Sequence, residues 1–269
     1  MNLLLLEPEE IDAASRARLR GRRAEHIRSV LRAEAGQTLR VGVVGGGLGQ
    51  GRVIQVDREA VELEIAIEAA TPEMTTPQTT TPKTATPQTV SWVDLIVGLP
   101  RPAVLHRVLQ TVAVMGVGRL DLTASWRVEK SYFSSPVLRP ESIRKHLLLG
   151  AEQGMTTRLP QVVQHRKLVP LLHELEVDPD PPQRLLAHPD AAEPIEAVWT
   201  PAPGRRLEIA IGPEGGWIDR EVDSFLAAGF VACSLGPWIL RVENAVTAAL
   251  AQADLVRRRA AGESAGAPC

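Results

Sequence analysis

Two glycine-rich turns near the C-terminal end constrain the fold more than any other feature of this sequence. The apolar residues 209–211 lead into Gly-Pro-Glu-Gly-Gly at 212–216, and a second turn, Leu-Gly-Pro-Trp-Ile-Leu at 235–240, follows after one intervening segment. An apolar run of β-formers that stops at a Gly/Pro-rich turn predicts a strand that feeds a loop of bare backbone. Each turn alone is typical of an ordinary strand-to-helix connection. The pair indicates a small-molecule pocket built largely from main-chain groups.

Strand and helix patterns alternate after residue 90. The sequence predicts strands over residues 93–99, 117–124, 184–188 and 206–211, and helices over residues 104–115, 140–154, 219–228 and 243–260. Such alternation implies a mostly parallel sheet with helices on both faces. We therefore expect an α/β domain over residues 91–269.

The first seventy residues favour a compact β-rich domain. Strands are expected over residues 37–44, 52–56 and 60–67, with a hairpin loop over residues 45–51. The glycines of this loop do not fit a nucleotide-binding pattern, and a strand rather than a helix follows them, so the turn interpretation is favoured. The Thr/Pro tract over residues 71–90 has almost nothing to bury and is expected to be a linker.

Arginine is concentrated near the N-terminus, although the formal net charge of the chain is only −2. Between Asp12 and Arg40 there are eight arginines against three acids. Guanidinium groups suit phosphate recognition, whereas the alternative is a solvated helix face. The residues that we expect to contact RNA are Arg22, Arg23, His26, Arg28 and Arg32.

The cysteines and the apolar segments bear on the compartment. Cys233 and Cys269 are far apart and form no disulfide framework, and no set of residues has the spacing of a metal site. The apolar N-terminal run lacks a basic leader, and no apolar stretch is long enough to cross a bilayer. We expect a cytoplasmic protein with no metal and no membrane partner.

Three charged residues at the two turns are candidate functional groups. Glu214 could fix its loop by accepting backbone N–H bonds, or it could point into the pocket. Glu243 falls in the first turn of an expected helix, where the helix dipole favours an acid. Arg241 could pair with an acid or bind phosphate. The residues alone leave these alternatives open.

Taken together, the motifs resemble those of the RsmE family of 16S rRNA (uracil-N3)-methyltransferases, in the SPOUT superfamily. The resemblance covers nearly the whole chain and is carried by residues 23–37, 105–117, 151–160, 211–216 and 235–243. The last two segments are the most specific, because they follow the two family motifs in the family's order and at the family's separation.

The resemblance implies a PUA-like β-barrel that holds rRNA over residues 1–70, and an α/β domain with a deep trefoil knot over residues 91–269. The knot loops would bind S-adenosyl-L-methionine, and a homodimer would complete each site. The residues placed against this cofactor are Leu186, His188, Ile211, Gly212, Glu214, Gly215, Gly216, Leu235, Gly236, Ile239 and Leu240.

The implied reaction is methylation of N3 of a uridine in 16S rRNA. N3 is a poor nucleophile while protonated, and loss of its proton places negative charge on the flanking carbonyl oxygens. Arg241 could stabilise this charge, and Glu243 or Glu214 could accept the proton, so these three are the candidate catalytic residues. N3 lies on the Watson–Crick edge, so the base must be unpaired to react.

The chain departs from the family pattern at several positions. Trp238 stands where most relatives have Arg, and Asn244 stands where they have Thr. Ile218 replaces a helix-capping Ser, a role that Asp219 would take over. Two alternatives therefore remain, namely a SPOUT methyltransferase with another RNA target and a catalytically inactive, RNA-binding ribosome-assembly factor.

Overall fold

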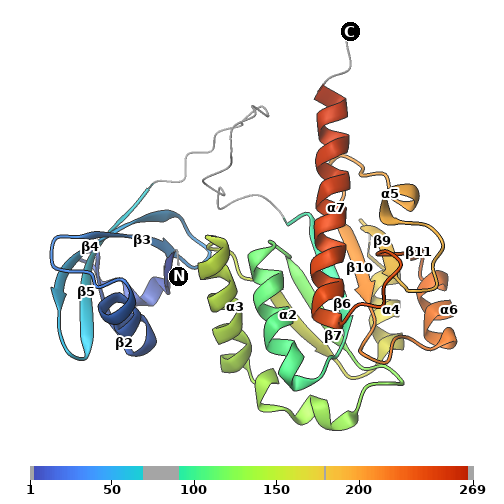
Figure 1. Cartoon of the computed structure of the whole chain (residues 1–269), viewed down its shortest axis with the longest axis horizontal. Coiled ribbons are helices and arrows are strands. Elements are labelled where there is room, and N and C mark those ends of the chain that lie inside the picture. Colours follow the sequence, from blue (N-terminus) through green and yellow to red (C-terminus); the bar gives the residue numbers. More distant parts are fainter. Residues whose placement is uncertain (1–2, 69–90, 179, 266–269) are drawn as a thin grey trace. The chain divides into compact units, whose positions relative to one another are not determined.

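The computed structural model describes residues 3–68, 91–178 and 180–265. The Thr/Pro tract expected to be a linker lies outside the described residues. The chain forms two compact units: an N-terminal unit of residues 1–89 and 148–159, and a C-terminal unit of residues 90–147 and 160–269 (Figure 1). The N-terminal unit thus includes residues 148–154, which form the C-terminal half of helix α3 (Pro140–Gly154).

The N-terminal unit is built on a five-stranded sheet with the order β1-β3-β4-β5-β2. Strands β1 and β3 are parallel, and the other pairs are antiparallel. The elements are β1 (Leu4–Leu6), η1 (Pro8–Glu10), β2 (Arg16–Arg20), α1 (Gly21–Glu25), η2 (His26–Val30), β3 (Thr38–Val43), β4 (Leu48–Val56) and β5 (Ala60–Ile67). Alternate residues such as Ala17, Leu19, Leu63 and Ile65 point into one buried core, as expected for half-buried strands.

The hairpin loop is shorter than the predicted range of residues 45–51, because β4 already begins at Leu48. Gly45 makes the turn with a φ of +70°, whereas Gly49 and Gly51 lie inside the strand. A Cβ atom on Gly49 would lie 2.1 Å from the main-chain oxygen of Ala66. These two strand glycines are therefore explained by close packing and not by a turn.

The C-terminal unit contains a six-stranded, fully parallel sheet with the order β11-β9-β10-β6-β7-β8. The prediction of an α/β domain with a parallel sheet is confirmed. The strands are β6 (Val93–Gly98), β7 (Arg119–Thr123), β8 (Gln161–His165), β9 (Gln183–Ala187), β10 (Leu207–Ile211) and β11 (Val231–Cys233). The helices are α2 (Pro102–Val114), η3 (Lys130–Ser134), η4 (Pro136–Leu138), α3 (Pro140–Gly154), α4 (Leu168–Glu176), α5 (Ile195–Val198), α6 (Asp219–Ala227) and α7 (Val242–Ala265).

Both faces of this sheet are covered. Helices α4 and α6 pack against one face, where Leu186 and Ala210 join a cluster around Phe225. The alternate residues Leu185 and Ile209 are also buried, so the opposite face is covered as well. Burial on both sides explains why these strands read as continuous apolar runs. No helix in the described ranges is both long and apolar enough to cross a membrane.

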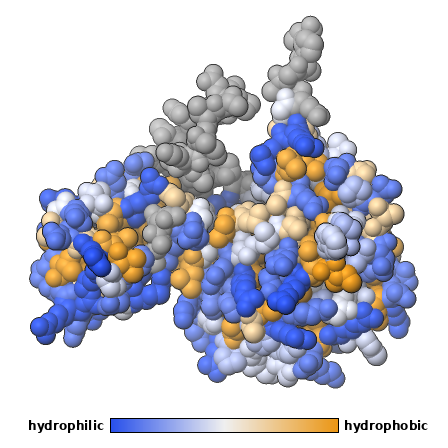
Figure 2. Space-filling model, viewed as in Figure 1, coloured by the Kyte–Doolittle hydropathy of each residue, from blue (hydrophilic) through white to orange (hydrophobic). Residues whose placement is uncertain are grey.

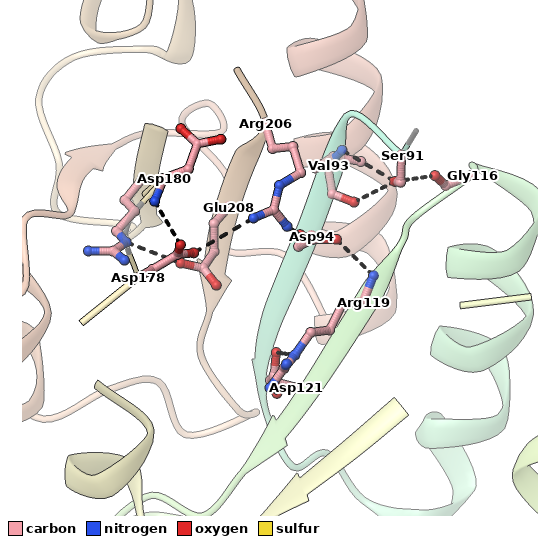
Figure 3. A network of polar contacts seen from close by, with 11 residues as sticks. Ser91, Val93, Asp94, Gly116, Arg119, Asp121, Asp178, Asp180, Arg206 and Glu208 are labelled. Atoms are coloured by element: carbon pink, nitrogen blue, oxygen red, sulfur yellow. Dashed lines mark hydrogen bonds and ion pairs between the residues drawn. The ribbon is translucent and has the colours of Figure 1, made fainter. Parts of the chain in front are cut away.

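A row of buried carboxylates crosses the central strands (Figure 3). Asp94 on β6 is paired in register with Glu208 on β10, and Asp121 lies on β7. Three arginines neutralise this row: Arg206 Nη1 lies 2.6 Å from Asp94 Oδ2, Arg119 Nε lies 2.7 Å from Asp121 Oδ2, and Arg184 Nε lies 3.3 Å from Glu208 Oε2.

Burial has the largest effect on the pKa values of Glu208 and Asp94. It raises the pKa of Glu208 to about 7, because the ion pair with Arg184 only partly offsets burial, and Asp121 and Asp94 add negative charge nearby. Burial also raises the pKa of Asp94, against the opposing effect of Arg206. The middle of the sheet therefore holds a carboxyl group poised to titrate near neutral pH.

Cys233 is fully buried at the end of β11, and burial raises the pKa of its thiol to about 12. The prediction that Asp219 caps α6 is wrong. Ile218 occupies the N-cap position, and Glu221 Oε2 accepts a 3.0 Å hydrogen bond from its backbone N–H. The side chain of Glu221, the third helical residue, thus satisfies the backbone N–H of the N-cap residue, which is the acid's half of a capping box.

Candidate functional site

A pocket of about 460 Å³ lies at the carboxyl ends of β9, β10 and β11. Because these strands are parallel neighbours, the loops that follow them emerge at the same edge of the sheet (Figure 1). The pocket is lined by the loops that follow the three strands and by the first turn of α7. Both glycine-rich turns that the sequence singled out, 212–216 and 235–240, contribute to its wall.

Nearly all of the predicted cofactor-binding residues meet at this pocket. Those that line it are His188, Ile211, Gly212, Glu214, Gly215, Gly216, Leu235, Gly236, Ile239 and Leu240. Leu186 does not, because its side chain is fully buried in the cluster under α6. Ala187 lines the wall in its place, as the alternation of side chains along a strand requires.

Glycine is required at specific points of the two turns. A Cβ atom on Gly212 would lie 3.2 Å from both the Cα atom of Gly216 and the backbone N of Trp217. Gly216 and Gly236 have φ angles of +71° and +122°, which favour residues without a Cβ. The chain therefore folds back tightly on itself and presents main-chain groups to the pocket.

Glu214 both accepts a backbone N–H bond and lines the pocket, which are the two roles that the sequence left open. Its Oε1 atom accepts a 2.9 Å hydrogen bond from the backbone N–H of Arg101, the N-cap residue of α2. This contact fixes the 212–216 loop against the start of α2. The same side chain is exposed and lines the pocket.

The other two candidate catalytic residues lie just beyond the pocket. Glu243 Oε1 accepts a 2.9 Å hydrogen bond from Arg107 Nη1, whereas its Oε2 atom is buried without a partner. The Arg241 side chain is exposed and has no hydrogen bond or ion pair among the described residues. Neither residue lines the pocket.

Arg127 is the functional candidate that the sequence did not reveal. It comes from the loop after β7, and its Nη1 atom donates a hydrogen bond to the main-chain oxygen of Gly215. Among the lining residues, it supplies the one guanidinium. Its loop carries no recognisable motif, so only the order of the strands, which sets β7 two positions from β10, brings it to the site.

The pocket wall also carries polar and aromatic groups that sequence reasoning did not assign to it. Asp190 and Asp219 add two acids, and the backbone N–H of Asp190 donates to His188 Nδ1 at 3.3 Å. Trp238 lines the pocket although its side chain is 77% exposed. Figure 2 shows hydrophobic and hydrophilic residues side by side on the face of the C-terminal unit that carries α7.

In the N-terminal unit, most of the arginines predicted to contact RNA already have partners. Arg22 Nη2 lies 2.9 Å from Glu152 Oε2, a nearly fully buried carboxylate. Arg23 pairs with Glu10 and donates to the main-chain oxygen of Leu5 at 2.8 Å.

The remaining predicted RNA contacts differ from one another. Arg28 pairs with Glu25 and donates to the main-chain oxygen of Asp57 at 3.1 Å. Arg32 is exposed and its guanidinium has no partner among the described residues. His26 has a buried Nε2 atom without a partner, and burial, followed by nearby positive charge, lowers its pKa. Of the four arginines predicted to contact RNA, Arg32 is thus the one that is exposed and has no partner among the described residues.

The part of the chain that the structure describes contains no set of side chains arranged as metal ligands. No group of three or more His, Cys, Asp or Glu side chains in these residues is arranged to hold a metal ion.

Comparison with known proteins gives two family matches. A model described as an RNA methyltransferase domain matches residues 86–254, which is more than half of the chain. A second model, described as an RNA methyltransferase PUA domain, matches residues 19–66.

Individual relatives span almost the whole chain. Ribosomal RNA small subunit methyltransferase E of Treponema pallidum is 28% identical over 255 residues, which cover 93% of this chain and 90% of that protein. The protein of the same name from Bacillus subtilis is 23% identical over 263 residues, covering 94% and 96%. Among solved structures, the enzyme of that name from Neisseria gonorrhoeae, bound to S-adenosyl methionine, matches with a TM-score of 0.71 and 22% identity, covering 93% of this chain and 95% of that one.

Proposed function

Because this chain belongs to the RNA methyltransferase family, we propose that it transfers a methyl group from S-adenosylmethionine to N3 of a uridine in 16S ribosomal RNA. The observation that carries the proposal is the pocket at the carboxyl ends of β9, β10 and β11, walled by the two glycine-rich turns. Relatives named ribosomal RNA small subunit methyltransferase E match more than nine-tenths of the chain, which supports the choice of substrate.

The residues of the pocket fit S-adenosylmethionine. The volume of about 460 Å³ suits a small molecule. The bare backbone around Gly212 and Gly216 offers amide and carbonyl groups to an adenosyl moiety. The acids Asp190, Glu214 and Asp219 on the wall complement a cationic ligand. When bound, S-adenosylmethionine supplies a methyl group attached to a positively charged sulfur.

The chain then has to position and activate the uracil. Positioning carries much of the rate, because attack by N3 in line with the methyl needs little else once N3 is deprotonated. Arg127 stabilises the negative charge that deprotonation places on the uracil oxygens, since its guanidinium lies on the pocket wall and is held there by Gly215. Arg241 stays a second candidate for this role, because its uncommitted side chain is free to meet substrate.

Glu214 is the best-placed proton acceptor of the two candidate acids. It lines the pocket, and the bond to Arg101 N–H occupies one carboxylate oxygen and leaves Oε2 available. Glu243 is held by Arg107 and lies outside the pocket wall. We therefore assign proton acceptance to Glu214 and a positioning role at the start of α7 to Glu243.

The proposal includes binding of rRNA by the N-terminal domain. The match of residues 19–66 to an RNA methyltransferase PUA domain supports binding of small-subunit rRNA by the N-terminal domain. The trefoil knot, the homodimer, the cytoplasmic location and the domain boundaries at residues 70 and 90 stay predictions. A different RNA target, or loss of activity, would leave the fold and the pocket as they are.

Mass mapping of 16S rRNA tests the proposal directly. RNA from a strain that lacks this gene should lack one methyl group on one uridine, and expression of the wild-type chain should restore it. Expression of Glu214→Gln should restore it poorly. An unchanged methylation pattern in the deletion strain would reject the assigned substrate. Calorimetry with S-adenosylmethionine then separates a different target, which retains cofactor binding, from an inactive RNA-binding factor, which does not.

A further inference from the structure

Cations without acidic partners line the carboxyl edge of the C-terminal sheet beside the pocket. Arg101 follows β6, Arg127 follows β7, and Arg166 and Lys167 follow β8. All four side chains are exposed, and none of them pairs with a carboxylate within the described ranges. The arginines on the strands of the same sheet differ, because Arg119, Arg184 and Arg206 each pair with a buried acid (Figure 3).

Three nearby acids, Glu214, Glu221 and Glu129, bind backbone or hydroxyl groups and none of these cationic side chains. Glu214 accepts from the backbone N–H of Arg101. Glu221 accepts from the backbone N–H of Trp126 at 2.8 Å and from that of Ile218 at 3.0 Å. Glu129 accepts from two hydroxyl groups of its own loop. Positive charge therefore stays available to a ligand at this edge.

Contacts between the loops make this edge one continuous surface. The 212–216 loop contacts Arg101 through Glu214 and Arg127 through Gly215. The guanidinium of Arg166 lies over the ring of Phe133, 5.3 Å from its centre. Phe133 lies in η3, which directly follows the loop that holds Arg127. The cations thus extend from the pocket wall to β8, the edge strand of the sheet.

Aromatic residues are interleaved with these cations. The whole chain has five Trp, one Tyr and three Phe. Trp126 lies in the loop after β7, and Tyr132 and Phe133 lie in η3, which follows that loop. The Trp126 side chain is 81% exposed, so its indole has little protein to pack against. An exposed aromatic ring beside cations, as at Trp126, is a feature by which proteins bind single-stranded nucleic acid, because the ring stacks on a base and the cations neutralise phosphates.

We propose that Arg101, Trp126 and Arg166, here called the edge surface, bind the single-stranded RNA that flanks the target uridine. The arginines contact phosphates, and Trp126 stacks on a base next to the one that enters the pocket. The C-terminal unit thus makes its own RNA contacts. The identity of the target rests on the proposed function, whereas binding of single-stranded RNA at this surface can be measured independently of it.

The test measures binding of a fluorescent, uridine-containing single-stranded RNA to the full chain over a range of salt concentrations. The variants are Arg101→Gln, Arg166→Gln and Trp126→Ala, all of which avoid the residues that line the pocket. The matched control is Arg259→Gln, because Arg259 is an exposed arginine of α7 that also has no partner among the described residues. Calorimetry with S-adenosylmethionine runs in parallel.

Each edge arginine variant should weaken RNA binding and lower the slope of log affinity against log salt by about 0.7. Trp126→Ala should weaken binding about 5-fold or more, and Trp126→Phe should recover most of that loss. The control should stay near wild type, and the affinity for S-adenosylmethionine should be unchanged in all variants.

Unchanged RNA affinity in all three edge variants would overturn the proposal. A change in particle mass by light scattering, with RNA affinity intact, would also overturn it and assign the surface to a protein partner. Failure of the proposed function has a different signature: the wild-type chain would transfer no methyl group, while the edge variants would still lose RNA affinity.

Discussion

Arg127 donates a hydrogen bond from Nη1 to the main-chain oxygen of Gly215, although the two residues are 88 positions apart. The bond joins the loop after β7 to the loop after β10, across the intervening strand β6. The contact is also tight, because a Cβ atom on Gly215 would lie 3.0 Å from the Cβ and Cδ atoms of Arg127. The identity of residue 215 therefore controls where the guanidinium sits.

Gly215→Ala should displace Arg127 from the pocket wall. The φ angle of Gly215 is not positive, so alanine is tolerated by the backbone, and the clash falls on the Arg127 side chain. We expect methyl transfer to fall about tenfold, with the free energy of unfolding changed by less than about 1 kcal/mol. Gly262→Ala is the control, because no atom lies within 4 Å of its new Cβ. Normal turnover in Gly215→Ala would show that the position of Arg127 is not critical.

Arg127→Ala and Arg241→Ala should differ in their effect on turnover. Arg127 lines the pocket and Arg241 does not, so loss of Arg127 should lower kcat about 100-fold if it stabilises developing negative charge. Arg127→Lys should recover part of the rate. Arg241→Ala should mainly raise the KM for RNA. The check is single-turnover kinetics with the affinity for S-adenosylmethionine measured alongside, and unchanged turnover would remove the substituted arginine from the mechanism.

The sequence predicts the elements of the C-terminal unit best where local signals agree. Helix α3 runs over residues 140–154 as expected, because Pro140 suits a helix start and the apolar period continues to Gly154. Strands β6 and β10 are recognisable as runs buried on both faces. Strand β8 was not predicted, because Gln161–His165 is half exposed and its residues lack a strong alternation.

The residues of the site also differ in whether a local sequence signal reveals them. Gly212 and Gly216 are four positions apart, and their backbone requirements can be read from the sequence itself. Arg127 cannot be found in this way, because its contact with Gly215 arises from strand order and not from local pattern. The charge cluster near the N-terminus shows the opposite error: Arg22 and Arg23 suggest a free basic surface, but the fold supplies them with acids from distant segments.

Arg23 and Arg32 should have separable roles in the N-terminal unit. Arg23→Gln removes the pair with Glu10 and the bond to Leu5, so the free energy of unfolding should fall by about 2 kcal/mol. Arg32→Gln removes an exposed guanidinium that has no partner in the described part of the chain, and it should leave stability unchanged while weakening RNA binding. Urea denaturation and RNA titration of both variants check this assignment. A stable Arg23→Gln with weakened RNA binding would instead make Arg23 an RNA contact.

The contribution of Glu208 to stability should fall as pH rises from about 4.5 to about 7. Its pKa is raised from 4.5 to about 7 in the folded state, chiefly by burial. Below 4.5 the carboxyl is protonated in both states and has no effect. Between the two values the folded state holds more protons than the unfolded state, so the free energy of unfolding decreases with pH. The loss is complete above about 7 and amounts to at most about 3 kcal/mol.

Glu208→Gln isolates this effect, because the amide cannot ionise and keeps a similar shape. Denaturant unfolding of both proteins at several pH values from 4.5 to 8 should give a difference in unfolding free energy that grows with pH in favour of the variant. The other ionisable groups are the same in both proteins, so to first order their contributions cancel in the difference. Arg184 opposes the trend, because loss of the Glu208 charge leaves its guanidinium without a carboxylate. A difference that does not change with pH would mean that Arg184 keeps Glu208 ionised throughout, and that burial does not control its pKa.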